Sequence, residues 1–144
     1  MVYYEGNPYN LGQGNSKLQW ARSKSGNTTW RIVTGCLWEE IHAGTLKRSP
    51  LDTWLLLNLL QRTYREISGQ KIYDLEEPVQ HAERSEDGQT TWEVRAGCLY
   101  ERSPHSLSFT LSQEDTLTLA NLLLANSDDI STIVNGLKHS ARNS

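Results

Sequence analysis

Short segments of the chain alternate apolar and polar residues with the period of two that is typical of β-strands. Between residues 28 and 34, Trp30 and Ile32 are separated by Arg31, so one face of this segment is apolar. The segment from Leu107 to Leu111 alternates most clearly. We therefore predict antiparallel strands joined by short turns. The predicted strands include 17–23, 28–34 and 107–111, with turns at 25–27 and 87–89, hairpin tips at 42–44 and 103–105, and extra strands at 2–5 or 9–11 and at 71–74.

Two Leu-rich segments carry the signals of helix starts. Ser49 offers a side-chain acceptor at the N-cap, Pro50 suits the first helical position, and Asp52 lies near the positive end of the helix. Ser112 begins a second segment of the same kind. We predict helices over 50–67 and 113–125, each apolar around most of its circumference and therefore buried on more than one side. The simplest arrangement packs these two helices against each other.

The two strand-and-helix segments are copies of each other. At an offset of 62 residues, ten of the 22 positions from Leu18 to Glu39 match identical residues, and at an offset of 63 the matches resume from Ser49. The change of offset falls at the predicted hairpin tips, where loops absorb insertions. The ten matched positions are Arg22, Ser23, Gly26, Thr28, Thr29, Trp30, Gly35, Cys36, Leu37 and Glu39, which recur as Arg84, Ser85, Gly88, Thr90, Thr91, Trp92, Gly97, Cys98, Leu99 and Glu101.

We therefore predict a single compact α+β domain made of two tandem repeats, residues 1–70 and 71–126, related by a pseudo-twofold axis. Each repeat is an antiparallel three- to four-stranded sheet followed by one long helix. Apolar residues at helical spacing from Ile130 to Leu137 predict a short C-terminal helix within 127–144, without a counterpart in the first repeat and with a frayed tail from residue 139.

Asn58 and Asn121 occupy equivalent points inside the two Leu-rich helices. Across a pseudo-twofold axis their amides would meet and fix the register of the helix pair, as single buried Asn residues do in coiled coils. The alternative is that each Asn lies on a narrow solvent-facing strip or bonds a loop. The first interpretation assigns both residues to a helix-pair interface.

Two strand-rich units, each closed by one long helix, resemble the Whirly-like or transcriptional-coactivator-type single-stranded-DNA-binding fold, in which such units pair through their helices. The resemblance is one of layout and covers residues 1 to 126. No signature motif accompanies it, so no functional residue is carried over. It implies that the protein binds single-stranded nucleic acid.

The net charge of −3 hides an uneven distribution. Residues 1–70 hold 8 Lys and Arg against 5 Asp and Glu, whereas residues 71–144 hold 6 against 12. The first repeat is therefore basic and the second acidic. An acidic whole chain argues against a dedicated nucleic-acid binder, but the basic first repeat keeps that function open.

Sequence motifs for catalysis, cofactors or metals are missing. The chain has no Gly-rich phosphate loop, nucleophile elbow or His-Glu metal helix. Cys36 and Cys98 occupy equivalent places and are expected to act as small buried apolar residues, while His42 and His105 fall near hairpin tips and are expected to be solvated. We predict a non-enzymatic protein without metal or cofactor. The absence of a signal segment and of a long apolar run predicts a cytoplasmic protein outside the membrane.

Aromatic and basic residues gather in the first repeat, where they suit single-stranded nucleic acid, because rings stack on bases while cations follow phosphates. Trp30 and Trp54 repeat as Trp92 and Leu117 and are expected in the core. Trp20 and Trp38 repeat as Ala82 and Tyr100, which makes them the candidates for exposure. The predicted contact residues are Trp20, Trp38, Lys17, Arg22, Lys24 and Arg31.

Two functions follow from this distribution. The first is binding of single-stranded DNA or RNA through the sheet of the first repeat. The alternative is a protein-protein interaction or assembly factor of regulatory role, which presents the acidic second repeat and the C-terminal helix to a protein partner or to a second copy in a homodimer.

Overall fold

The computed structural model describes residues 19–42, 44–70, 80–104 and 106–143. Two four-stranded antiparallel sheets follow each other along the chain, and each keeps its strands in sequence order. Sheet A consists of β1 (Trp20–Arg22), β2 (Thr29–Val33), β3 (Cys36–Ile41) and β4 (Gly44–Lys47), followed by α1 (Pro50–Arg62) and α2 (Tyr64–Ile67). Sheet B consists of β5 (Ala82–Arg84), β6 (Thr91–Arg95), β7 (Cys98–Ser103) and β8 (Ser106–Thr110), followed by α3 (Gln113–Ala125) and α4 (Ser127–Asn143). The predicted α+β layout is confirmed.

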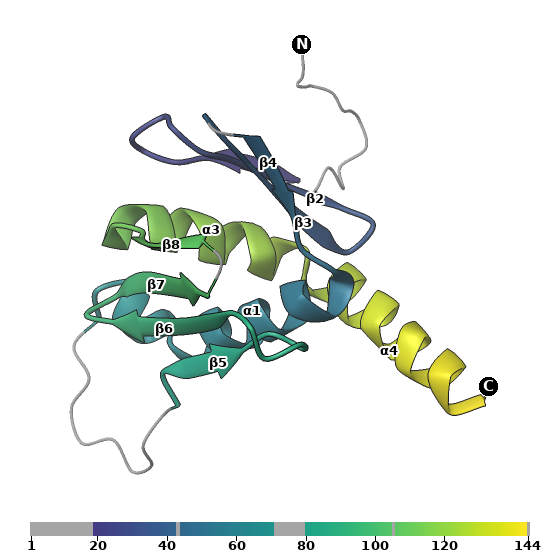
Figure 1. Cartoon of the computed structure of the whole chain (residues 1–144). Helices are drawn as coiled ribbons and strands as arrows, with labels where there is room; N and C mark the ends of the chain where they lie inside the picture. The colour runs from purple at the N-terminus through teal and green to yellow at the C-terminus, as the bar shows by residue number, and fades with distance from the viewer. Residues whose placement is uncertain (1–18, 43, 71–79, 105, 144) are drawn as a thin grey trace, which may run out of the picture.

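Helices α1 and α3 lie between the two sheets (Figure 1). Helix α1 contacts β3 of its own repeat and also β5 and β6 of the other, and α3 contacts β7 together with β1 and β2. The two helices also pack against each other, as predicted. Apolar side chains from both sheets and all helices form one buried cluster, which includes Trp30 and Trp92 at 0% exposure. Neither repeat therefore has a core of its own.

The helix starts form as predicted. The Ser49 side chain accepts a hydrogen bond from the Asp52 N–H and the Ser112 side chain accepts one from the Asp115 N–H, both at 3.1 Å. Helix α3 has the predicted bounds. The predicted helix 50–67 is wrong in one respect, because Thr63 interrupts it: its φ of −105° leaves the helical range, and its hydroxyl donates to the Leu59 carbonyl at 2.7 Å.

The C-terminal helix is longer than predicted, since α4 continues to Asn143 through the tail that was expected to fray. Its first turn also has a counterpart, contrary to expectation. At the offset of 63 residues, α2 matches the start of α4, and Ile67 and Ile130 at matching positions are both fully buried. The duplication therefore extends to Ile130, five residues past the end of α3. Helix α2 ends at Ile67 and is followed by Gly69 with a positive φ, whereas α4 continues.

The strands connect through turns that agree with the sequence. Thr34–Gly35 and Ala96–Gly97 join β2 to β3 and β6 to β7 with positive φ at both residues, the geometry of two-residue hairpins. The predicted tips at 42–44 and 103–105 also connect paired strands, since Ile41 pairs with Gly44 and Ser103 with Ser106. The extra strands predicted at 2–5 or 9–11 and at 71–74 lie outside the described residues. In the part of the chain that is described, no helix combines the length and apolarity needed to cross a bilayer.

Candidate nucleic-acid interface

Four side chains form a row across sheet A on the face turned away from the helices, which we call the outer face of sheet A. The strand register pairs Trp20 with Arg31, Arg31 with Trp38, and Trp38 with Lys47. Successive side chains of a strand alternate between faces, and Trp30 and Ile32 are buried toward the helices. The row Trp20, Arg31, Trp38, Lys47 therefore points outward and runs perpendicular to the strands.

This row is accessible. Trp20 is 53% exposed, and the side chain of Arg31 is 57% exposed. Trp38 is half-buried because Lys47 folds over it, with its Nζ 5.2 Å from the ring centroid, a cation–π distance. Aromatic rings and cations thus alternate along the row.

A second row lies beside the first on the same face, since Arg22 pairs with Thr29 and Thr29 with Glu40. Arg22 is exposed. Arg31 Nε lies 3.3 Å from Glu40 Oε1, so one carboxylate partly neutralises this face. Arg22, Arg31 and Lys47 outweigh it, and the face is basic.

The structure brings four of the six predicted contact residues together on this face: Trp20, Trp38, Arg22 and Arg31. Lys24 lies in the β1–β2 turn, where its side chain is exposed and its backbone N–H donates to Asp115 Oδ1 at 2.6 Å. Lys17 lies outside the described residues. Sequence reasoning missed Lys47 as a contact residue. Counting outward from the predicted tip at 42–44 would have paired Lys47 with Glu39, whereas the observed pairing of Ile41 with Gly44 places it beside Trp38.

The matching row of sheet B has a different composition. Its members are Ala82, Glu93, Tyr100 and Thr110, paired in the same register. One aromatic ring remains at the position of Trp38, and the cation at the position of Arg31 is replaced by a carboxylate. The alternating row of rings and cations is therefore a property of sheet A.

The amides of Asn58 and Asn121 do not form the predicted pair between the described helices. Asn121 is exposed, and its Oδ1 accepts a hydrogen bond from the Tyr64 hydroxyl at 2.7 Å. Asn58 is half-buried. Asn121 therefore lies on a solvent-facing part of α3, as the alternative had it, and links α3 to α2.

Beneath the sheets, an ionic cluster joins the two repeats. Glu39 and Glu101 occupy matching positions and are both buried; each accepts a hydrogen bond from the indole Nε1 of its paired Trp, Trp30 at 3.2 Å and Trp92 at 2.8 Å. Arg48 lies between them, bonded directly to Glu101 and 3.8 Å from Glu39. Burial raises the pKa of Glu39, Arg48 lowers it in opposition, and the Glu101 charge adds to the increase.

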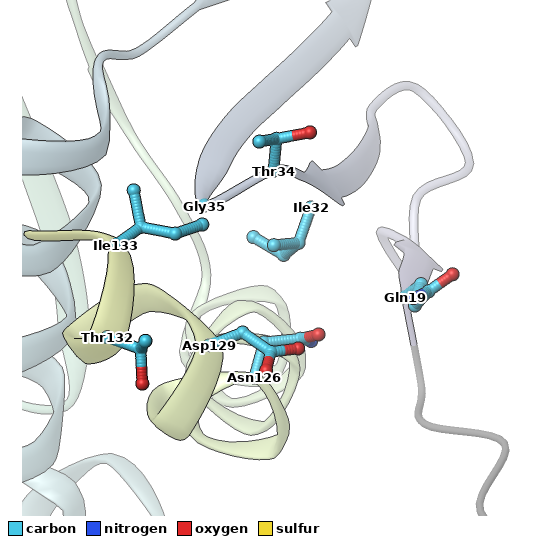
Figure 2. Close-up of a pocket in the computed structure, with 8 residues that line it drawn as sticks. All are labelled: Gln19, Ile32, Thr34, Gly35, Asn126, Asp129, Thr132 and Ile133. Carbon is cyan, nitrogen blue, oxygen red and sulfur yellow. The ribbon is translucent and has the colours of Figure 1, made fainter. Parts of the chain in front are cut away.

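A small hollow lies where α4 meets the end of sheet A (Figure 2). It has a volume of about 190 Å³. Gly35 permits this contact, because a Cβ there would lie 2.8 Å from Ile133 Cδ1. Its lining residues are Gln19, Ile32, Thr34, Gly35, Asn126, Asp129, Thr132 and Ile133.

The duplication explains this hollow. At the matching place in sheet B, the longer Glu66 carboxylate accepts from the Gly97 N–H at 3.1 Å and contacts His81 Nε2 at 3.0 Å. Asp129 stands where Glu66 stands in the other repeat and is one methylene shorter. The volume is below the roughly 300 Å³ at which ligand pockets begin, so we assign no ligand to the hollow.

The described residues contain no group of three or more His, Cys, Asp or Glu that could hold a metal ion. Cys36 is buried and Cys98 half-buried, and both are free thiols. Trp30 lies in the core as predicted, and Trp54 is partly buried against it.

Comparison with known proteins finds no relative: no protein-family model matches the chain, and neither a curated protein nor a solved structure is significantly similar to it. The resemblance to the Whirly-like fold therefore stays a prediction from layout.

Proposed function

We propose that the protein binds single-stranded nucleic acid on the outer face of sheet A. The observation that carries this proposal is the row Trp20, Arg31, Trp38, Lys47, in which rings and cations alternate across four strands. We also propose that the protein acts in the cytoplasm, which its free thiols support, because that compartment keeps cysteines reduced.

The row suits a single strand for geometric reasons. Neighbouring strands lie about 4.8 Å apart, so Trp20 and Trp38, separated by β2, stand roughly 10 Å apart with Arg31 between them. Bases of an unpaired strand can stack on both rings while Arg31, Lys47 and Arg22 approach the phosphates between them. Bases inside a duplex are stacked on each other and offer no free face to Trp20. We therefore expect single strands to bind more tightly than duplexes.

The expected contributions follow from general measurements. Stacking of a base on an aromatic side chain contributes about 1–3 kcal/mol. Each phosphate neutralised by a cation adds about 0.7 to the slope of log affinity against log salt for a single strand. Trp20 is the better probe of stacking, because its exposed ring contributes little to the core.

Fluorescence anisotropy of a labelled oligothymidine tests this function. Trp20→Ala should weaken binding roughly 5- to 150-fold, the range that corresponds to one lost stacking contact. Arg31→Glu should weaken it further and lower the salt slope by about 0.7 or more. Arg65→Glu is a matched control, because Arg65 is exposed on α2 and belongs to no strand of either sheet, and its reversal should leave affinity nearly unchanged.

Two results would contradict the proposal. One is no measurable binding by the whole chain at low salt. The other is equal loss of affinity in Arg31→Glu and Arg65→Glu, which would indicate a diffuse charge effect and no defined face.

Protein binding through α4 is a second candidate, because Leu137 is 52% exposed on the stripe that buries Ile130 and Val134. Lys138 on the same helix covers Trp54, with Nζ 4.3 Å from the ring centroid. Affinity capture with the whole chain and with Leu137→Glu tests it. A stoichiometric protein captured by the first and lost with the second would support this candidate over nucleic-acid binding.

A further inference from the structure

The outer face of sheet B, the side turned away from α1 and α3, is basic although its repeat is acidic. Arg84, Arg95 and Arg102 are exposed there, and Glu93 is the one carboxylate among the outward-facing strand residues described. Sheet A has the same balance on its outer face, with Arg22, Arg31 and Lys47 against Glu40. The two outer faces therefore carry equal charge, although the totals of the two repeats differ in sign.

The negative charges of the second repeat lie elsewhere. Glu101 is buried in the ionic cluster. The remaining described acidic residues lie mainly in the β5–β6 turn and in the first turns of α3 and α4, including Glu86, Asp87, Glu114, Asp115, Asp128 and Asp129. The charge count along the sequence thus hides the character of this sheet face.

Comparison of matching positions indicates that the charges were exchanged between rows. Arg22 and Arg84 match directly. Where sheet A has Arg31 and Glu40, sheet B has Glu93 and Arg102. Lys47 is matched by Thr110 and Val33 by Arg95, so each face keeps three cations and one carboxylate. An aromatic ring is kept at the centre of both faces.

That ring is again covered by a cation. The Arg95 guanidinium Cζ lies 4.4 Å from the centroid of Tyr100, as Lys47 lies over Trp38. Arg95 Nε also lies 3.4 Å from Glu93 Oε1, with both side chains more than a third exposed, so this pair is screened by water and weak.

A hollow of about 180 Å³ opens beside Tyr100. It lies where the pairing of β7 and β8 shifts register between Glu101 and Ser103. Its lining includes the Tyr100 ring, hydroxyl groups and the Arg102 guanidinium, together with Glu93 and Glu101. The hydroxyl residues are Thr91, Ser108 and Thr110. At about 180 Å³ the hollow is too small to enclose a nucleotide, so it adds hydroxyl groups and a cation to the open surface around the Tyr100 ring, on which a base would lie.

We propose that the outer face of sheet B is a second face for single-stranded nucleic acid, with Tyr100 against a base and Arg84, Arg95 and Arg102 against phosphates. Since the helix pair separates the sheets, the two faces point away from each other (Figure 1), and one chain holds two strand segments on opposite sides. This inference rests on the proposed function, because the ligand class is the same.

Titration calorimetry and native mass spectrometry with an oligothymidine of about 6 nucleotides, near the lower end of known site sizes, measure the stoichiometry. We expect two oligonucleotides per chain. The double variant R84E/R102E should bind one oligonucleotide. The double variant W20A/R31E, which lacks the stacking ring and the cation on the outer face of sheet A, should also bind one. Arg65→Glu should still bind two. The charge-neutral pair R84Q/R102Q, which adds no repulsion, should weaken the second site at least several-fold with an unchanged thermal unfolding midpoint.

The outcomes separate the two proposals. One oligonucleotide per chain, with all binding lost in W20A/R31E, overturns the second face and keeps the first. Binding lost in R84E/R102E and kept in W20A/R31E supports sheet B and overturns the assignment to sheet A. No binding to the whole chain overturns both. If R84E/R102E instead changes the sedimentation coefficient of the free protein, the face joins two copies of the chain and the inference is wrong.

Discussion

Arg48 lies between two carboxylates that the duplication brought to equivalent positions, but Arg48 itself has no duplicate. Its counterpart is Leu111, and the backbone N–H groups of both donate to matching carbonyls, of Leu37 and Leu99, at 2.8 Å. One cation therefore serves two buried carboxylates. The direct bond to Glu101 and the longer distance to Glu39 make the two carboxylates unequal, and burial raises the pKa of Glu39.

This inequality predicts a pH dependence. As the pH rises above 4.5, the ordinary pKa of a Glu carboxyl, Glu39 loses its proton in the unfolded chain but keeps it in the folded protein until the pH reaches the raised pKa. The contribution of this raised pKa to the free energy of unfolding is therefore fully present below pH 4.5 and is lost as the pH rises through the pKa of the folded state. Denaturant unfolding across this window should show that the free energy of unfolding of the wild type falls with pH relative to that of Glu39→Gln.

A difference between wild type and Glu39→Gln that stays constant with pH would show that the pKa of Glu39 is the same in the folded and unfolded states. At pH 7, Glu101→Gln should lower stability by about 2 kcal/mol, because Arg48 loses its charged hydrogen-bond partner.

At the scale of elements, each long helix holds a turn of the opposite sheet. Asp52 in the first turn of α1 accepts from the Glu86 N–H at 2.8 Å, and Asp115 in the first turn of α3 accepts from the Lys24 N–H. These contacts cross between the repeats, because the helix that follows one sheet holds the first hairpin turn of the other sheet. The Asp115 contact also holds the turn that directly follows Arg22, one of the residues on the outer face of sheet A.

Removing one anchor should therefore destabilise the whole molecule. Asp115→Ala loses a charge-assisted hydrogen bond and a favourable charge at the helix start, with an expected cost of about 1–3 kcal/mol. Chemical denaturation measures it. Glu114→Ala, one residue earlier and exposed, changes the same charge without the turn contact and should cost well under 1 kcal/mol. Equal costs for the two variants would mean that the contact with the turn contributes nothing.

At the scale of the whole molecule, the two repeats share one core. Trp30 and Leu37 on sheet A lie in the same buried cluster as Trp92 and Leu99 on sheet B, with α1 and α3 between them. An isolated repeat would expose the apolar side of its helix that covers the other sheet. The duplication therefore gives one folding unit and no pair of independent domains.

Separated halves test this conclusion. Residues 1–70 alone should lack a cooperative thermal transition by circular dichroism, and an equimolar mixture with residues 71–144 should regain it, because the missing helix and sheet are then supplied. The intact chain is the reference. A cooperative transition in the isolated first half would show that its own sheet and helix make a sufficient core.

Local rules explain which features were predictable. The α3 bounds follow from the Ser112 cap, the hairpin tips follow from Gly and from the change of offset, and burial of Trp30 follows from the period-two pattern. The break at Thr63 was not predicted, because no Gly or Pro marks it in the sequence. It is seen only in the backbone of Thr63, whose φ of −105° lies outside the helical range. Of the contact face, Trp20, Arg22, Arg31 and Trp38 were predicted, whereas Lys47 required the register across β3 and β4.

The amino-acid sequence by itself determined the duplication, the element types and the caps, since these depend on residues near each other in the chain. Only the tertiary structure decided which charges share a face. Strand register gathered Arg84, Arg95 and Arg102 on one side of an acidic repeat, and the crossing of helices between repeats brought Arg48 to Glu101 and Asn121 to Tyr64. Such contacts join residues far apart in sequence, and the packing of the whole core determines them.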